Sequence, residues 1–407
     1  MRRAALALLL ALTGCAADPV PVVPAPSAPS SAASPASIFP RWRALGAAGL
    51  PTGTGAFEPE RVAAGRHGFA MLSTDEYGRQ GLFFSADGTA WTRTVSAFDR
   101  QARDLATDGR DVYLLVHDTY ATEATVWTLR SGGGWEDAET LRSRLGPVES
   151  PGSWAVTAGP RGVVVAHVRD GRRVVELWAS TGGGFERTEA ATVDLHAEQR
   201  PYNLLSLQLL PTAAGPVAVY DRYGSLYAAT AGELPAAVPQ ALPPNANVSR
   251  VAVNGSHWVV DGWLYEPLRP GDPGYLADDP TGENDRFRPA TWCSDGSGGV
   301  ATARVDGGRL PDLGVSGAHE AASVRPYRTG FLMVGSTGNA TNQTTTPGVW
   351  WSPDGCAWHK DQVRANGFDA AERFTDVATT GESTLLAGGL RDAEGPQTRL
   401  WLGSGLQ

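Results

Sequence analysis

Short apolar runs separated by turns recur along the chain from residue 39 onward. One recurring piece is an apolar strand, a turn that usually contains glycine, and a second apolar run, as in RVAAGRHGFAML. Each run has the length of a strand, so each copy predicts an antiparallel hairpin. The seven copies lie at residues 61–72, 104–116, 155–168, 206–220, 250–262, 323–335 and 376–389.

A third strand with an aromatic residue follows each hairpin. These aromatic residues are Phe83, Trp127, Trp178, Tyr227, Trp292, Trp350 and Trp401. In the clearest units a tight turn and a fourth strand follow, with aromatic residues at Trp91, Trp135, Phe185 and Trp358. Units of four antiparallel strands at intervals of roughly 40 to 70 residues are typical of β-propeller blades. The pattern therefore predicts an all-β domain, residues 39–407, in which seven four-stranded blades bury their faces against one another.

The ends of the chain predict how the ring closes. The last unit stops at LWLGSGLQ and lacks a fourth strand, while Trp42 in PRWRALG stands in the same context as Trp91. We therefore expect the N-terminal strand to complete the last blade, which hides an otherwise exposed sheet edge.

Two turns between third and fourth strands are nearly identical, SADGTAW at 85–91 and SPDGCAW at 352–358. Aspartate can accept backbone N–H bonds within such a turn, glycine can supply a positive φ, and the tryptophan can pack underneath. The turns resemble the Asp-box of bacterial-neuraminidase-repeat (BNR) propellers, in a form one residue shorter. The resemblance implies a sialidase-like propeller and a structural role, not a catalytic one. The residues concerned are Ser85, Asp87, Gly88, Trp91, Ser352, Asp354, Gly355 and Trp358, with Asp295 in a weaker third copy.

The first residues predict export. MRRAALALLLALTGC has two arginines and a short apolar run, which is typical of a signal peptide over residues 1–14. Its end resembles the lipobox of bacterial lipoproteins, and this implies cleavage before Cys15 and acylation of the Cys15 thiol. The rest of segment 15–38 is rich in Pro, Ala and Ser, which predicts a disordered tether. We expect a lipid-anchored protein on the extracytoplasmic face of a bacterial cell membrane.

The net charge and the cysteine and histidine positions predict which partners, cross-links and metals to expect. The formal net charge of −9 and the absence of a basic run argue against nucleic acid as a partner. Cys293 and Cys356 fall near the ends of third strands in consecutive units of an exported domain, which predicts a disulfide; two separate buried thiols are the alternative. The scattered histidines show no metal-binding or catalytic spacing, so we expect no metal and no cofactor.

Candidate ligand-binding residues lie at the entry to the innermost strands. Four arginines occupy such positions, and guanidinium groups facing a central funnel can hold an anion. These residues are Arg61, Arg103, Arg250 and Arg373. The alternative is that they pair with the neighbouring acids Glu60, Asp104, Glu372 and Asp376.

Long polar loops are the other candidate site. The longest is the insertion at 266–289, which contains Asp272, Asp278, Asp279, Glu283 and Asp285; a second spans 336–348. Such loops on a rigid scaffold often carry binding residues. Acidic oxygens suit calcium, but the insertion has no EF-hand pattern.

These features favour a non-catalytic, monomeric propeller that binds a protein, glycan or envelope component. One alternative is a sialidase-like glycoside hydrolase. Resemblance to that family implies three arginines on a substrate carboxylate, a tyrosine nucleophile assisted by glutamate, and an aspartic acid. The Arg-Ile-Pro element of those enzymes is missing here, since residues 39–42 are FPRW. The other alternative is an extracytoplasmic assembly factor for a membrane complex.

Overall fold

The computed structural model describes most of the chain after residue 40. The described residues are 41–45, 57–75, 77–94, 102–117, 122–145, 152–159, 162–169, 174–181, 184–195, 206–212, 215–222, 225–230, 242–243, 246–271, 285–294, 300–305, 308–309, 319–339, 344–360, 368, 373–380, 382–392 and 395–404. The signal peptide, Cys15, the tether, Asp295 and residues 272–284 of the insertion lie outside them. All described strands belong to the compact unit Ile38–Gln407. No helix in the described part is long and apolar enough to cross a membrane.

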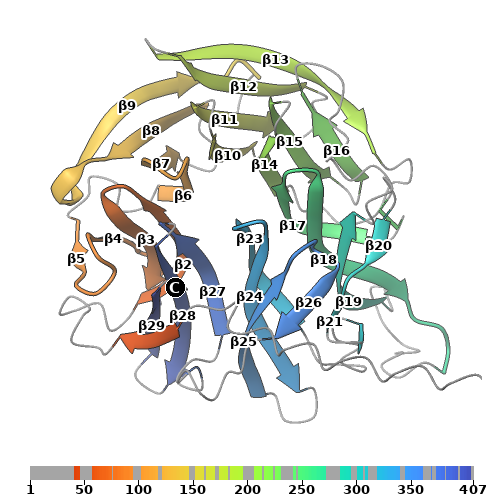
Figure 1. Ribbon diagram of the computed structural model, residues 1–407. Helices are drawn as coiled ribbons and strands as arrows, with labels where there is room; N and C mark the ends of the chain where they lie inside the picture. Colours follow the sequence, from red (N-terminus) through yellow and green to blue (C-terminus); the bar gives the residue numbers. More distant parts are fainter. Residues whose placement is uncertain are drawn as a thin grey trace, which may run out of the picture. The chain divides into compact units, whose positions relative to one another are not determined.

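The described strands form six sheets in a propeller-like ring (Figure 1). Three of the sheets each consist of four strands that follow one another in the chain. The first holds β2 (Phe57–Gly65), β3 (Gly68–Asp75), β4 (Gln80–Ser85) and β5 (Thr92–Arg93), and the second holds β6 (Ala102–Thr107), β7 (Val112–His117), β8 (Glu123–Leu129) and β9 (Trp135–Arg142). The third holds β17 (Ala246–Asn254), β18 (His257–Pro267), β19 (Asp285–Ser294) and β20 (Val300–Thr302). The protein is therefore all-β in its described part, as the sequence predicts, apart from a short 3-10 turn at Ser131–Gly133.

Two larger sheets and a final sheet complete the ring. One holds β10 (Gly152–Gly159), β11 (Gly162–Arg169), β12 (Val174–Thr181), β13 (Gly184–Asp194), β14 (Ser206–Thr212), β15 (Gly215–Arg222) and β16 (Ser225–Ala229). Another holds β21 (Arg304–Val305), β22 (Gly308–Arg309), β23 (His319–Tyr327), β24 (Gly330–Asn339), β25 (Thr344–Ser352) and β26 (Ala357–Lys360). The last holds β27 (Arg373–Thr379), β28 (Ser383–Asp392), β29 (Gly395–Ser404) and β1 (Arg41–Leu45).

The predicted count of seven separate blades is not confirmed, because β13 joins two strand groups into one sheet. Its first eight residues pair with β12 up to Ala191. Its last three residues, Thr192–Asp194, pair instead with β16. A strand of eleven residues is long enough to leave one group and continue along the outer edge of the next.

Ring closure by the N-terminal strand is confirmed. β1 pairs antiparallel with β29, and Trp42 stands opposite Gly403. Trp42 is 8% exposed and packs edge-on against Phe368, with 5.8 Å between the ring centroids. The edge of the last sheet is therefore covered by a segment from the other end of the chain.

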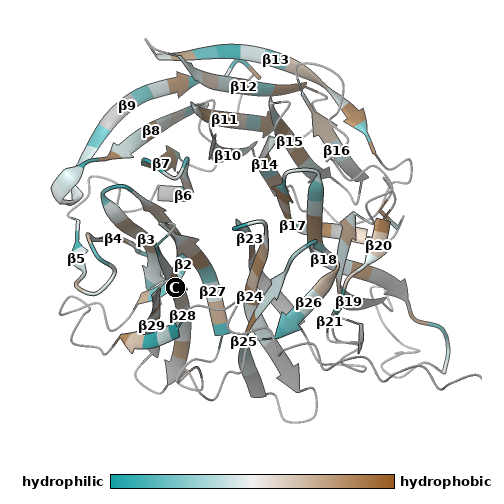
Figure 2. Cartoon of the chain, viewed as in Figure 1, coloured by the Kyte–Doolittle hydropathy of each residue, from teal (hydrophilic) through white to brown (hydrophobic). Residues whose placement is uncertain are grey.

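Apolar side chains of neighbouring sheets pack together in buried clusters. Many of the strands concerned are brown, that is hydrophobic, over part of their length in Figure 2. Leu72 and Leu82 of one sheet pack with Leu114 and Val116 of the next. Each buried side chain of this size contributes roughly 1.5–3 kcal/mol. The third-strand aromatics predicted to pack between blades are buried at Phe83, Trp178, Trp292, Trp350 and Trp401.

The two repeated turns have the same internal hydrogen bonds. In the first, Asp87 Oδ1 accepts the N–H of Thr89 at 2.8 Å, and Gly88 donates to Ser85 Oγ at 2.9 Å. Trp91 Nε1 donates to the Gly88 carbonyl at 3.1 Å. In the second turn Asp354, Gly355, Ser352 and Trp358 make the equivalent contacts. The carboxylates are used to hold the backbone of the turn.

The predicted disulfide is confirmed. Cys293 of β19 is bonded to Cys356, with Cα atoms 5.3 Å apart and a sequence separation of 63 residues. Cys356 belongs to the second repeated turn, and its carbonyl also accepts the Arg304 N–H at 2.7 Å. The bond therefore fastens one sheet to the next beside the short parallel pair β21–β26.

Candidate functional site

The innermost strands surround a central cavity of about 580 Å³. These strands are β2, β6, β10, β14, β17, β23 and β27, which lie nearest the centre of the ring in Figure 1. Consecutive innermost strands contact one another, and β27 contacts β2 again. A cavity of this size suits a small ligand or one end of a larger one.

Five innermost strands carry a β-bulge at corresponding places. The register shifts fall just before Arg61, Asp104, Arg250, Ser323 and Asp376. An extra residue at this point re-aims the following side chain. Four of the five line the cavity, the exception being Asp376. The repeated bulge is thus the local reason that polar side chains reach the centre of an otherwise apolar ring.

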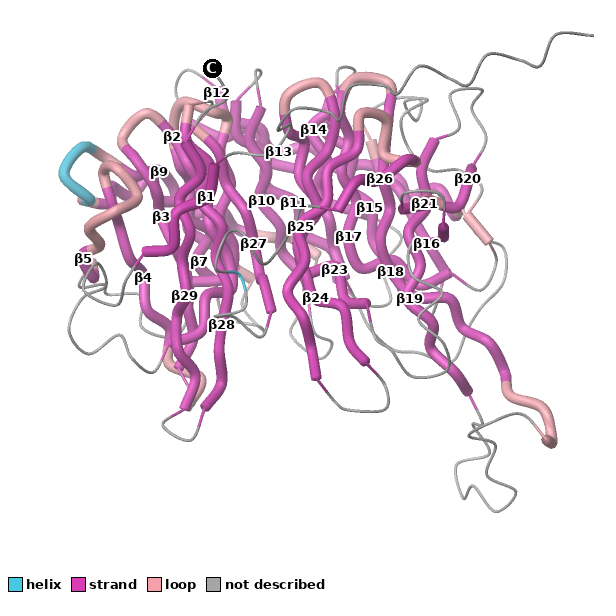
Figure 3. The backbone as a smooth tube through the Cα atoms, turned by 60° about the horizontal axis from the view of Figure 1, so that its bottom comes forward, coloured by secondary structure: helices cyan, strands magenta, loops and turns pink. Residues whose placement is uncertain are grey.

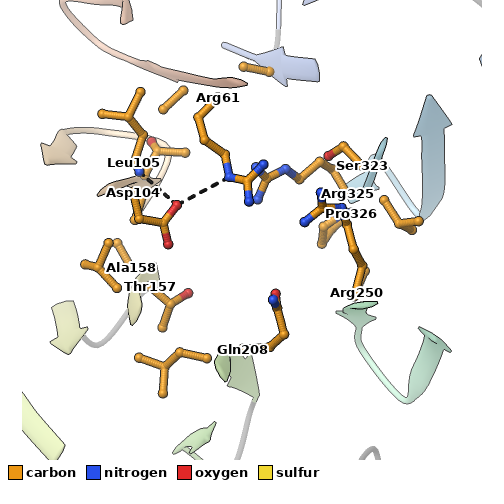
Figure 4. A pocket seen from close by; sticks show the side chains of 18 of the residues that line it. Arg61, Asp104, Leu105, Thr157, Ala158, Gln208, Arg250, Ser323, Arg325 and Pro326 are labelled. Atoms are coloured by element: carbon orange, nitrogen blue, oxygen red, sulfur yellow. Dashed lines mark hydrogen bonds and ion pairs between the residues drawn. The ribbon is translucent and has the colours of Figure 1, made fainter. Parts of the chain in front are cut away.

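Three guanidinium groups converge in this cavity (Figure 4). They belong to Arg61, Arg250 and Arg325, from three different sheets. The sequence prediction included Arg61 and Arg250 but missed Arg325. Arg325 lies two residues after Ser323, and side chains two apart on a strand share a face. The two-residue spacing was visible in the sequence. The bulge, which decides whether this set of alternate residues faces the cavity, was not.

Asp376 holds Arg325 in place from a fully buried position. Its carboxylate accepts hydrogen bonds from Arg325 Nε at 3.2 Å and Nη2 at 2.9 Å. It also accepts from Ser323 Oγ at 2.6 Å and from the N–H groups of Val62 and Val377. Burial raises the pKa of Asp376, but the nearby arginine charges and these hydrogen bonds outweigh it, so the pKa lies below its usual value.

Asp104 has a much looser environment. Its Oδ1 accepts the Leu105 N–H at 2.9 Å and lies 3.6 Å from Arg61 Nε. Burial raises the pKa of Asp104 above its usual value, although the charges of Arg61 and Arg325 oppose the shift. The Arg61–Asp104 pair agrees with the alternative that the arginines bind neighbouring acids.

Arg250 is the least satisfied of the three arginines. Its Nε, which solvent does not reach, has no hydrogen-bond partner among the described residues. Burial and then the charge of Arg61 lower the pKa of Arg250 to about 10, while Asp376 and Asp261 oppose the shift. Arg250 is therefore charged at neutral pH, and a buried donor without a partner favours a ligand that brings an acceptor.

The structure does not bring Arg373 into this cluster, and it does not test Arg103. Arg373 is half-exposed, donates from Nε to Glu58 at 2.8 Å, and is not among the cavity residues. Its partner among the described residues is Glu58 and not Asp376, while Glu372 lies outside those residues. The backbone of Arg103 lies in β6, but its side chain is outside the described residues. In β6 the cavity position belongs to Asp104.

The strands at the two ends of the insertion form an extended hairpin. β18 reaches Pro267 and β19 begins at Asp285, and Figure 3 shows this hairpin extending past the neighbouring strands. Its acidic residues Asp272, Asp278, Asp279 and Glu283 lie outside the described part, as do the side chain of Asp285 and residues 340–343 of the second loop. Within the described residues no three His, Cys, Asp or Glu side chains form a group that could hold a metal ion.

In its described part, the cavity lining lacks part of the sialidase-like set of side chains. Tyr327 lines it, but no glutamate does among the described residues. The tyrosine–glutamate pair of the hydrolase hypothesis therefore has no counterpart in the described lining.

Comparisons with known proteins give fold-level similarity at most. No family model matches the chain, and no curated protein matches it. The β-propeller domain of the Trilobed protease from Pyrococcus furiosus is 7% identical, with a TM-score of 0.43, over 86% of this chain and 96% of that one. Trypanosoma rangeli sialidase is 9% identical, with a TM-score of 0.41, over 86% of this chain and 55% of the sialidase.

A structure from a study of two prolyl endopeptidases is 13% identical, with a TM-score of 0.41, over 86% of this chain. The chain spans 46% of that protein's length. Because these TM-scores and sequence identities are low, we describe the fold from the sheet topology of this chain and argue its function from its own residues.

Proposed function

We propose that this protein is a non-catalytic binding propeller that holds an anionic group of a glycan, protein or envelope component in its central cavity. The observation that carries the proposal is the convergence of Arg61, Arg250 and Arg325, together with the unpartnered Nε of Arg250. Guanidinium groups bind carboxylates through paired hydrogen bonds, and burial strengthens such contacts.

The arrangement of charges favours a carboxylate over a multiply charged anion. Asp376 already neutralises Arg325 at hydrogen-bond distance, and Asp104 partly neutralises Arg61. Asp261, which stands opposite Arg250 in the β17–β18 register, adds a further negative charge. A singly charged group needs less compensating charge than a phosphate dianion, which these aspartates would repel.

We further propose that the ring has seven blades. Each blade would start with one of the seven innermost strands, and β13 would serve two of them. The seven hairpins of the sequence and the seven innermost strands found among the described residues support this count.

The proposed cellular context is a lipid anchor at Cys15 on the outer face of the membrane. The lipobox-like sequence and the Pro/Ala/Ser-rich segment before β1 support it. The alternative function, that of an extracytoplasmic assembly factor, would use the same cavity but bind a protein of a membrane complex. A hydrolase is less well supported, because the three arginines have no described glutamate beside them.

Ligand screening tests the proposal. The purified full chain, in detergent, is heated with N-acetylneuraminate, glucuronate, acetate, sulfate, envelope glycans or Ca²⁺, and a fluorogenic sialoside is assayed in parallel. We expect a carboxylate to raise the melting temperature of the wild type and of Arg373→Ala, whose guanidinium lies outside the cavity, and to have no effect on Arg250→Ala. An equal shift in all three proteins would place binding elsewhere. Turnover of the sialoside would replace the binding proposal with the hydrolase.

A further inference from the structure

Two aspartates in corresponding places have very different surroundings. Asp104 and Asp376 each follow the register shift of their strand. Asp376 is fully buried and accepts five hydrogen bonds. Asp104, with a side chain 29% exposed, accepts one backbone N–H and has Arg61 as an ion-pair partner at 3.6 Å. The Asp104 carboxylate is therefore much less firmly held than that of Asp376.

The charged groups around Asp104 come from several strands. Arg61 on β2 is adjacent, and the charges of Arg325 on β23 and Asp376 on β27 also act on Asp104. On β7, His117 has its ring beside Trp154, with centroids 6.1 Å apart. The neighbouring strand β10 contains no acidic or basic residue. Asp104 thus faces two arginines, both of which an entering anion would also contact.

An anion that reaches Arg61 must compete with Asp104. Two carboxylates that share one guanidinium repel each other, and the repulsion disappears when one of them is protonated. A protonated carboxyl also gains an O–H donor, which can bond to the entering anion. Burial already raises the pKa of Asp104, so this carboxyl takes up a proton more readily than an ordinary aspartate.

We propose that Asp104 is the built-in counter-ion of Arg61, and that an anionic ligand displaces it and binds together with one proton. The proton comes from solvent and goes to the Asp104 carboxylate, while the ligand keeps its charge and no covalent bond changes. This regulation rests on the proposed function, since it concerns the same cavity. It makes binding strongest in acidic surroundings and favours release as the pH rises.

Calorimetric titration of the full chain tests this inference. The probes are N-acetylneuraminate and glucuronate, two singly charged carboxylates whose charges stay constant from about pH 5 to about pH 9. Titration in two buffers of different ionisation enthalpy reports the number of protons taken up. We expect up to one proton per ligand, and a Kd that rises up to about tenfold per pH unit where Asp104 titrates.

Two variants isolate Asp104. Asp104→Asn is neutral at every pH, so it should bind without proton uptake and with a Kd that does not change with pH. Asp108→Asn is the matched control, because Asp108 lines the same cavity but is held by the N–H groups of its own turn. It should keep the proton uptake.

The outcomes separate the two proposals. Binding by the wild type without proton uptake, or unchanged uptake in Asp104→Asn, overturns the role of Asp104 and leaves the proposed function intact. Failure of a correctly folded wild type to bind either probe at any pH contradicts the proposed function, and the role of Asp104 is overturned with it.

Discussion

At the scale of single residues, the position of a side chain relative to a bulge decides its role. Arg61 and Arg250 follow the register shifts of their strands and line the cavity, whereas Arg373 precedes the shift of β27 and lies outside it. Sequence alone places these three arginines on innermost strands, but only Arg373 stands at the entry of its strand, whereas Arg61 and Arg250 are each the fifth residue of theirs. It does not reveal the extra residue that sets which of them faces inward, because a slip of one residue reverses the faces of a strand.

Glu176 gives a prediction for acid stability. This buried carboxylate accepts hydrogen bonds from Ser143 Oγ at 2.5 Å and from the Arg144 N–H at 2.9 Å, and pairs with Arg187. Burial raises its pKa, but His167, whose Nδ1 lies 3.9 Å away, and these bonds outweigh burial and lower the pKa to about 2 from a usual value of 4.5.

The lowered pKa fixes the direction of the pH effect. Above pH 4.5 the carboxylate is ionised in both folded and unfolded chains, so its stabilisation is complete. Between about pH 4.5 and about pH 2 the unfolded chain takes up the proton first, and the stabilisation is lost. Urea unfolding at several pH values should show this loss in the wild type and a flatter curve in Glu176→Gln. Parallel curves for the two proteins would contradict the assignment.

At the scale of elements, the local sequence pattern predicts where strands and turns lie, but it does not predict which strands pair with each other. The alternation of apolar residues and turns predicts the hairpins well, and the repeated Asp-Gly turns adopt a common hydrogen-bond pattern. The double pairing of β13 was not predictable, because FERTEAATVD contains no glycine or proline to end the strand. Which neighbour a long strand pairs with is decided by the sheet beside it.

Gly88 tests the packing of the repeated turn. It has φ +79°, and a Cβ there would lie 2.9 Å from Leu402 of the last sheet. Gly88→Ala should lower the free energy of unfolding by about 1–2 kcal/mol for the left-handed backbone, plus a further cost for the contact.

Gly78→Ala is the matched control in chemical denaturation. Gly78 has φ +74°, and a Cβ there would meet nothing within 4 Å. Gly78→Ala should therefore lose only the part of the free energy of unfolding that the left-handed backbone conformation costs. Equal losses in the two variants would mean that the turn does not pack tightly against the neighbouring sheet.

At the scale of the whole molecule, the ring is held by contacts between segments far apart in sequence. β1 covers the edge of β29, and Cys293–Cys356 fastens two neighbouring sheets. Both features were predictable, because the repeat count leaves one strand missing and the cysteines fall on corresponding strand ends. The ligand was not predictable, because it depends on side chains that only the closed ring brings together.

Loss of the disulfide should destabilise the ring. For a loop of 63 residues the chain-entropy model gives about 4 kcal/mol. Urea unfolding of the Cys293→Ser, Cys356→Ser double variant should show a loss of this size. Reduction of the wild type should reproduce it and leave the double variant unchanged. A double variant as stable as the oxidised wild type would show that the sheets are held by packing alone.

The central claim is that the arginine cavity holds a singly charged anion, and a crystal structure of the chain grown with para-bromobenzoate tests it most directly. This ligand carries one carboxylate, and the anomalous scattering of its bromine locates it without ambiguity. We predict its carboxylate within hydrogen-bond distance of Arg250 and of Arg61 or Arg325, and no such ligand in Arg250→Ala crystals grown in the same way. An empty cavity in the wild type, with para-bromobenzoate bound only at the outer surface, would contradict this claim.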